Sequence, residues 1–260
     1  MRIMKRNLFL IGLVSLILSA CTTTSSNDVS SGTNQKASAI NVQLGVNYLR
    51  QGELKLADEK LRRAIKQDPN SSTAHWVFAL LQERLGEENV AEKHFRKAIS
   101  IDPKDSKAHN NYGTFLCNQD RVLEAEKEFL RAVEDPLYAE AASAYANAGI
   151  CVLKIPDKIA AEEYFQKSLN INPEHRSALI QMAKLSFERK EFSQTSSYIQ
   201  RFEKVSKHNS ESLWIAFQSE TNLGHEAKAD DYANMLKKLY PSSQEARLLA
   251  ETYWHAGRSN

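Results

Sequence analysis

Side chains that could carry out chemistry are few and scattered in this sequence. Seven histidines lie along the 260 residues, and no two of them are spaced four apart, as two ligands on one helical face would be. His225-Glu226 begins a zinc-protease pattern, but Ala229 stands where the second histidine is needed. Glycine-rich phosphate loops and serine nucleophile elbows do not occur in the sequence. We therefore predict a protein that is not an enzyme and uses no metal or cofactor.

The N-terminal segment has the pattern of a targeting signal. A basic stretch, Met1 to Arg6, precedes an apolar run from Leu8 to Leu18. Eleven residues cannot span a hydrocarbon core of roughly 30 Å as a helix. A basic region, an apolar region and small residues in this order are typical of a secretory signal peptide. We predict that residues 1–20 are such a peptide.

Cys21 has the surroundings of a lipidation site. Leu18-Ser19-Ala20-Cys21 resembles the bacterial lipobox, in which the cysteine is lipidated and becomes the mature N-terminus. By the sorting tendency of such lipoproteins, Thr22 after the cysteine implies the outer membrane. Residues 21–37 are expected to form a flexible tether, because they are polar and rich in Ser and Thr. The alternative is an ordinary signal peptide or a membrane anchor in which Cys21 is incidental.

Composition excludes several classes of protein. Charged residues make up 25% and hydrophobic residues 42%, as in soluble globular proteins. Only 9 Gly and 6 Pro are present, too few for the many turns of an all-β fold. The net charge is +2, and three of the Lys and Arg residues lie in the first 20 positions. The near-neutral remainder gives no electrostatic reason to expect nucleic-acid binding.

Small and apolar residues recur with a period of 34 from about residue 38. Each of the first four units has Gly or Ala at its eighth position, Ala at its twentieth and a larger apolar residue at its twenty-fourth. The first three units place these residues at Gly45, Ala57 and Leu61, then Ala79, Ala91 and Phe95, then Gly113, Ala125 and Phe129. The pattern resembles the tetratricopeptide repeat, which implies stacked pairs of antiparallel helices in a right-handed superhelix.

The period sets the expected boundaries of an all-α solenoid. Asp-Pro pairs at 68–69 and 102–103 should end helices, because the residue before Pro disfavours the α conformation. The fifth unit departs most from the pattern. Caps for the following helices are offered by Ser71, Ser72, Asp105, Ser106 and Ser210. We predict six repeats and a capping helix, at approximately 38–71, 72–105, 106–141, 142–175, 176–209, 210–243 and 244–257.

Cys117 and Cys151 fall on the first helices of the third and fourth predicted repeats, 34 residues apart. These helices should be neighbours in the stack. In an oxidising periplasm two nearby thiols tend to be joined, so we favour a disulfide. The alternative is a pair of buried free thiols that pack as small hydrophobic groups.

The first helices of the repeats should line a concave groove. Several groove positions carry large apolar side chains, which favour binding of an extended or helical peptide, and Asn110 and Asn118 could hydrogen-bond to its backbone. Some of these side chains could instead pack against adjacent helices. The predicted groove residues are Trp76, Leu80, Asn110, Thr114, Asn118, Ile150, Leu153 and Lys154.

Two segments go beyond a general repeat pattern. They are His109-Asn110-Asn111-Tyr112-Gly113-Thr114-Phe115-Leu116-Cys117 and Asn147-Ala148-Gly149-Ile150-Cys151. Both resemble signatures of the type IV pilus biogenesis and stability lipoproteins, the PilF/PilW pilotins. The lipobox, polar tether, six repeats and two cysteines also fall where that family has them, so the resemblance covers the whole chain.

The resemblance implies a lipid-anchored protein on the periplasmic face of the outer membrane. It implies binding of the pilus secretin subunit and support of its assembly into a multimer, on which pilus formation and twitching motility depend. No small-molecule substrate is expected. Two alternatives are a repeat lipoprotein that acts as scaffold or adaptor for other envelope machinery, such as outer-membrane protein assembly or a protease, and a peptidoglycan-associated regulator or unrecognised enzyme.

Overall fold

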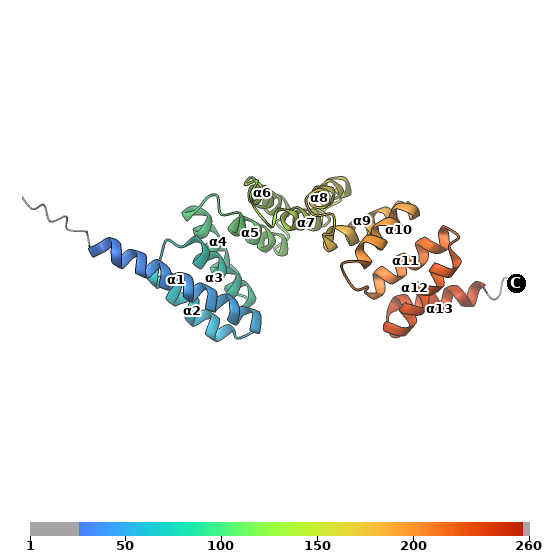
Figure 1. The fold of residues 1–260 in the computed structure, drawn as a ribbon, viewed down its shortest axis with the longest axis horizontal. Coiled ribbons are helices and arrows are strands. Elements are labelled where there is room, and N and C mark those ends of the chain that lie inside the picture. The colour runs from blue at the N-terminus through green and yellow to red at the C-terminus, as the bar shows by residue number, and fades with distance from the viewer. Residues whose placement is uncertain (1–25, 257–260) are drawn as a thin grey trace, which may run out of the picture.

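The computed structural model describes residues 26–256, which form thirteen α-helices and no strand. The predicted all-α solenoid is therefore confirmed. Figure 1 shows an elongated array that runs from α1 at one end to α13 at the other. The helices are α1 Ser26–Gln51, α2 Leu54–Gln67, α3 Ser72–Arg84, α4 Glu88–Ile101, α5 Ser106–Asn118, α6 Val122–Ala132, α7 Ala141–Val152, α8 Lys158–Ile171, α9 Arg176–Glu188, α10 Phe192–Glu203, α11 Ser210–Asn222, α12 Glu226–Leu239 and α13 Gln244–Ala256.

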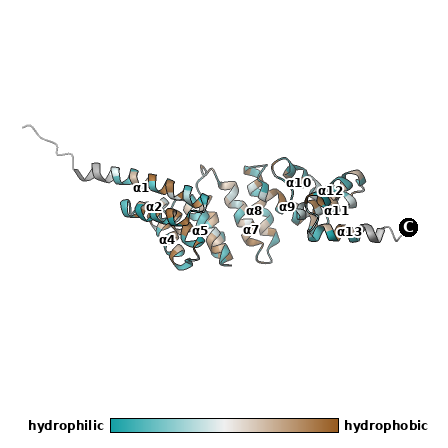
Figure 2. Cartoon of the chain, turned by 90° about the horizontal axis from the view of Figure 1, so that it is seen from below, coloured by the Kyte–Doolittle hydropathy of each residue, from teal (hydrophilic) through white to brown (hydrophobic). Residues whose placement is uncertain are grey.

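Each of the first twelve helices packs most extensively against its partner in a pair, from α1 with α2 to α11 with α12. Hydrophobic residues are spread along the whole array rather than gathered in one central core (Figure 2). α13 packs on α11 and α12 and covers the end of the last pair. None of the helices in residues 26–256 is long and apolar enough to cross a membrane.

Close approach of the two helices in a pair explains the recurring small residues. In the fourth repeat, Gly149 of α7 lies against the Phe165 ring of α8, where an added Cβ would stand 2.6 Å from the ring. Ala161 and Phe165 are completely buried. Gly113 meets Phe129 in the same way one repeat earlier, with a Cβ-to-ring distance of 2.9 Å. The period of 34 therefore arises from one contact between two helices, which is repeated along the chain.

Helix ends follow the local chemistry of the sequence. α2 and α4 stop at Asp68 and Asp102, whose backbones are extended before the following Pro. Ser71 and Asp105 cap α3 and α5 by accepting hydrogen bonds from the backbone N–H groups three residues later. In the sixth repeat the cap is Asn209, which forms a capping box with Ser212, rather than Ser210.

The start of α1 differs from the expected boundary at residue 38. α1 begins at Ser26, so residues 26–37 are helical where a flexible tether was expected. The segment contains no Pro, and the packed part of α1 supplies a helical nucleus onto which further turns can add. Cys21 and the predicted signal peptide lie outside the described residues.

The fifth repeat folds as a regular helix pair despite its weak sequence pattern. Thr195 takes the place of the usual Ala on α10 and is fully buried. Its hydroxyl donates to the Glu191 carbonyl, 3.1 Å away. Ser186 of α9 is also fully buried and donates to the Met182 carbonyl. Hydroxyls that bond within their own helix are satisfied inside the core, which explains why polar residues are tolerated there.

The first helices of successive pairs contact one another along the array, from α1 and α3 to α9 and α11. The second helices of successive pairs, α2 to α12, make no such contacts among the described elements. The array therefore curves with the first helices on its inner side. We call α1, α3, α5, α7, α9 and α11 the inner helices and the remaining helices of the pairs the outer helices.

Substituting Ala for Gly149 should destabilise the protein, because the new methyl group must displace the Phe165 ring. We expect a loss of about 1–3 kcal/mol in the free energy of unfolding, as for other overpacked cores. Gly32→Ala is the matched control, since no atom lies within 4 Å of a Cβ built at Gly32 on α1. Urea denaturation should show unchanged or slightly raised stability for this control. Equal stability of both variants would contradict the packing argument.

Candidate partner-binding face

All eight predicted groove residues lie on the inner helices or directly after the end of one of them. Trp76 and Leu80 lie on α3, Asn110, Thr114 and Asn118 on α5, and Ile150 on α7. Leu153 and Lys154 follow directly after α7. We call the surface formed by these eight residues the inner face.

Apolar residues of the inner face differ in how deeply their side chains are buried. Trp76, Leu80 and Leu153 are half-buried and pack against the hydrophobic core. Ile150 is 39% exposed and is the most open apolar side chain of the set. The indole Nε1 of Trp76 is buried and has no hydrogen-bond partner among the described residues. Ile150 is therefore the apolar side chain best placed to contact a partner.

Polar side chains of the third repeat already have partners within the protein. Asn110 is 8% exposed, and its side-chain carbonyl accepts from Asn147 Nδ2 at 3.2 Å. Thr114 is exposed and donates to the Asn110 backbone carbonyl at 3.1 Å. Asn110 is thus part of the contact between α5 and α7. The expected hydrogen bonds from Asn110 to a partner's backbone would compete with that contact.

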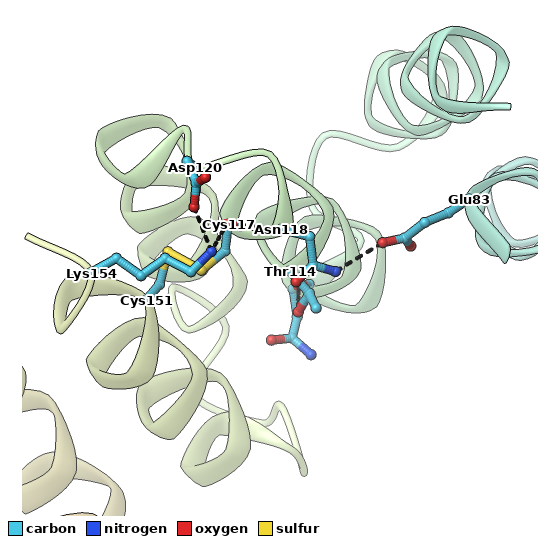
Figure 3. Close-up of a disulfide and its surroundings, with 8 residues drawn as sticks. Glu83, Thr114, Cys117, Asn118, Asp120, Cys151 and Lys154 are labelled. Carbon is cyan, nitrogen blue, oxygen red and sulfur yellow. Dashed lines mark hydrogen bonds and ion pairs between the residues drawn. A yellow bond between two sulfur atoms is a disulfide. The ribbon is translucent and has the colours of Figure 1, made fainter. Parts of the chain in front are cut away.

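A ladder of polar contacts ties successive inner helices together at their C-terminal ends. Arg84 Nη1 donates to the Leu49 carbonyl at 2.7 Å. Asn118 Nδ2 donates to Glu83 Oε1 at 3.0 Å. Lys154 Nζ donates to the Cys117 carbonyl and to Asp120 Oδ1, both at 2.7 Å (Figure 3). Asn118 and Lys154, expected to face a partner, are therefore rungs between neighbouring repeats.

The sequence contained a signal for this ladder that the motif analysis missed. Arg84 and Asn118 are separated by 34 residues, the repeat period, and Lys154 follows 36 residues later because the third connector is two residues longer. A polar side chain with N–H donors thus recurs at one position in three successive repeats. Each one reaches the residue just before the equivalent position in the preceding repeat.

Cys117 of α5 and Cys151 of α7 form a disulfide in the structure, with their Cα atoms 5.7 Å apart. Figure 3 shows the bond beside the Lys154 rung, so two links join the third and fourth repeats at one point. Closing a loop of this length contributes about 3–4 kcal/mol in the chain-entropy model. The disulfide joins the third and fourth repeats, whose connector is irregular. In that connector, the buried Tyr138 packs with Ala132 and Ala144.

A polar pocket adjoins the inner face and was not anticipated from the sequence. It has a volume of about 430 Å³ and lies between α7 on one side and the start of α9 with its preceding loop on the other. Ser143 and Asn147 line one side, and His175, Arg176 and Ser177 line the other. Arg176 is exposed and makes no ion pair with any described residue. Glu174 also lines the pocket, which therefore offers a carboxylate acceptor as well as hydrogen-bond donors, and Asn147 lies one helical turn before Ile150 on α7.

His75 and His109 occupy equivalent positions in the second and third repeats, and their different neighbours shift their pKa values in opposite directions. His75 and His94 bring their Nδ1 atoms to 2.9 Å, and His75 Nε2 lies 3.0 Å from the Pro69 carbonyl. Burial lowers the pKa of both, and the adjacent His75 ring helps to lower the pKa of His94 to about 4. One repeat later, Glu128 takes the place of His94 and lies 2.6 Å from His109 Nδ1. Burial opposes the charge on His109, but the bonds to Glu128 and to the Pro103 carbonyl raise its pKa.

The arrangement of the inner face suits binding of a protein segment. Within residues 26–256 no three His, Cys, Asp or Glu side chains are grouped so that they could hold a metal ion. The tied polar rungs keep the inner helices in register, and exposed apolar and polar groups lie between them. Such a surface can receive the side chains of a protein segment.

Comparison with known proteins defines the class first. Residues 42–106 and 94–127 each match the tetratricopeptide-repeat family. The stacked helix pairs and the inner face are those of a tetratricopeptide-repeat scaffold.

The particular family follows from three comparisons with two relatives. The type IV pilus assembly protein PilF of Pseudomonas aeruginosa is 31% identical over 204 residues, covering 78% of this chain and 81% of PilF. A solved structure from the functional characterisation of that PilF has a TM-score of 0.79 at 32% identity, covering 84% of this chain and 99% of the other. The crystal structure of PilW, a widely conserved type IV pilus biogenesis factor, has a TM-score of 0.71 at 28% identity, covering 82% and 98%. The chain belongs to the PilF family of type IV pilus biogenesis proteins.

Replacing His94 with Glu should reverse the effect of acid at this site. In the wild type, the pKa values of His75 and His94 lie below the unfolded value of 6.5, so stability falls as pH drops from 6.5 towards 4. His94→Glu recreates the His109–Glu128 pair, which raises the histidine pKa. The variant should therefore gain stability relative to wild type as pH falls below 6.5.

Urea denaturation above and below pH 6.5 measures this difference. His94→Gln is the control, because it removes one titrating ring without adding a carboxylate. Its pH dependence should be flatter than that of the wild type, without the gain expected for Glu. Parallel pH profiles for wild type and His94→Glu would show that the pair does not control stability.

Proposed function

We propose that this protein is a non-catalytic outer-membrane pilotin of the type IV pilus. Its inner face binds the pilus secretin subunit, and lipid at Cys21 holds the protein on the periplasmic side of the outer membrane. The complex promotes localisation of the secretin and its assembly into a multimer. Pilus formation and twitching motility then depend on it. Membership of the PilF family is the observation that carries this proposal.

A binding role for the inner face is supported by the exposure of its apolar residue Ile150. Ile150 is 39% exposed between the core residues Gly149 and Cys151, which are buried. Asn147, one helical turn before Ile150 on α7, lines the polar pocket together with Arg176. Burying one apolar side chain of this size in a partner contributes about 1.5–3 kcal/mol, and a few such residues dominate most interfaces. Neighbouring hydrogen-bond groups would fix the orientation of the bound segment.

Anchoring explains how a binding protein could promote assembly. A lipidated scaffold restricts its partner to a thin layer at the membrane, which raises the local concentration of secretin subunits. Two or three acyl chains hold a protein far more firmly than a single chain. The rigid inner face then presents each captured subunit in the same orientation.

Substituting Ile150 with Glu should weaken association with the secretin, because a charge would be buried at the centre of the contact. We expect about tenfold less secretin to co-purify with this variant than with wild type. Ile159→Glu on the outer helix α8 is the matched control, since Ile159 is 76% exposed and lies away from the inner face. Equal recovery with both variants would exclude Ile150 from the interface, and no recovery with the wild-type protein would defeat the proposal.

Cys21→Ala should remove the anchor and leave the helical array intact. Fractionation of cells is expected to move the variant out of the outer-membrane fraction, while circular dichroism of the purified protein stays unchanged. Mass spectrometry of the wild-type N-terminus should find acyl chains on Cys21. A variant that stays in the outer-membrane fraction would show that another feature holds the protein there.

A further inference from the structure

The outward side of α2 is strongly basic. Ala57, Leu61 and Ala64 form its buried side and are completely inaccessible to solvent. At 3.6 residues per turn, the opposite side of the helix contains positions 55, 59, 62, 63 and 66. Four of these five positions are exposed cations, namely Lys55, Arg62, Arg63 and Lys66.

The next outer helix, α4, repeats this arrangement. Positions 34 residues further on include exposed Lys93, Arg96 and Lys97. The two helices lie close enough that Arg62 of α2 helps to lower the pKa of His94 on α4, after burial and the charges of His75 and Lys93. Arg62 also lies over the Phe78 ring of the intervening α3, 5.0 Å from its centre. We call the seven cations of α2 and α4 the basic outer face.

Most charges of the basic outer face are uncompensated. Arg62 pairs with Asp58 at 2.7 Å and Arg96 with Glu92 at 2.8 Å, each within its own helix. The other five cations make no ion pair within 4.0 Å among the described residues; they are Lys55, Arg63, Lys66, Lys93 and Lys97. Glu59 is the one acidic residue at these outward positions of α2 and α4, and it pairs with Lys60.

The basic outer face is a local feature of the chain. Residues 38–71 contain six Lys and Arg against four Asp and Glu, residues 72–105 contain five against six, and residues 106–260 contain 19 against 21, so on α4 the cations stand out by their outward position and not by their number. At the equivalent outward positions of α8, one acid and one base balance each other among Ile159, Glu163, Gln166, Lys167 and Asn170. The outward positions of α2 and of α4 each carry a net charge of +3, against +2 at the equivalent positions of α10, so the largest positive charge on the outer side lies at the N-terminal end of the array.

We propose that the basic outer face docks on the anionic phospholipid headgroups of a bilayer. The face belongs to the repeats that directly follow the N-terminal segment, where the proposed lipid anchor lies, and to that extent the proposal rests on the proposed function. Unpaired cations spread over two successive outer helices suit a diffuse layer of headgroup charge, to which each Lys or Arg adds its own attraction. Exposed Leu56, at 38%, adds an apolar contact on α2.

Docking in this way would orient the scaffold. The inner helices lie on the opposite side of each pair from the basic outer face, so the inner face would stay open to the periplasm. A lipid anchor and a basic surface are the two signals that together give stable membrane attachment. The acyl chains would then fix the protein to the membrane, and the basic outer face would set which side faces a secretin subunit.

Vesicle sedimentation tests the proposal without the anchor. The chain from residue 22 onward lacks Cys21 and keeps all thirteen described helices. We expect it to pellet with vesicles of phosphatidylglycerol and phosphatidylcholine and to stay in solution with pure phosphatidylcholine. Raising the salt from about 0.1 M to about 1 M should release it, because the screening length shortens from about 10 Å to 3 Å.

A charge-matched pair of variants locates the surface. Lys55→Gln, Lys66→Gln and Lys97→Gln together should lower partitioning onto the anionic vesicles by about tenfold or more. Lys204→Gln, Lys207→Gln and Lys238→Gln remove three exposed cations from the opposite end of the array and should have little effect. Circular dichroism should show unchanged helicity for both.

Three results would overturn the proposal: no sedimentation with anionic vesicles, equal sedimentation with neutral ones, or equal loss in both triple variants. Acidic-protein binding by the basic outer face without any vesicle binding would assign it to a protein partner instead. The secretin and Cys21 experiments use other residues and other measurements. Failure of membrane docking is therefore distinguishable from failure of the pilotin role.

Discussion

The close approach of two helices at a small residue is the constraint on which this molecule depends. Gly45, Gly113 and Gly149 each leave space for a Leu or Phe side chain of the partner helix, and an added Cβ there would lie 2.6–2.9 Å from that side chain. Repetition of this contact builds helix pairs that bury their apolar sides only against neighbours. Two long surfaces are left, one formed by inner helices and the other by outer helices.

The two surfaces have different chemistry, and this difference organises the proposed function. The inner face combines exposed Ile150 with hydrogen-bonding groups, and a ladder of polar contacts and a disulfide hold its helices in register. The outer side of the first two repeats carries unpaired cations instead. A scaffold that binds protein on one side and lipid on the other can hold its partner at the membrane in a fixed orientation.

Several features of the site could be anticipated from the sequence, and others could not. Cys117 and Cys151 were placed on neighbouring helices because the period fixes which residues share a position in the stack. Asn118 and Lys154 were placed on the inner face, but their engagement with Glu83, Asp120 and the Cys117 carbonyl was missed. Whether a polar side chain reaches the preceding repeat depends on the rotation between repeats, which a linear pattern does not contain. The extension of α1 to Ser26 was missed because its polar residues carry no periodic signal.

By itself, the sequence determined the fold class and the residues at which several helices end, such as Asp68 and Asp102. It could do so because these depend on contacts that recur every 34 residues and on turn residues that act locally. Only the tertiary structure decided which side chains hold neighbouring repeats together and which remain available to contact a partner. That division depends on the distances between atoms of different repeats, and those distances are set by the curvature of the whole array.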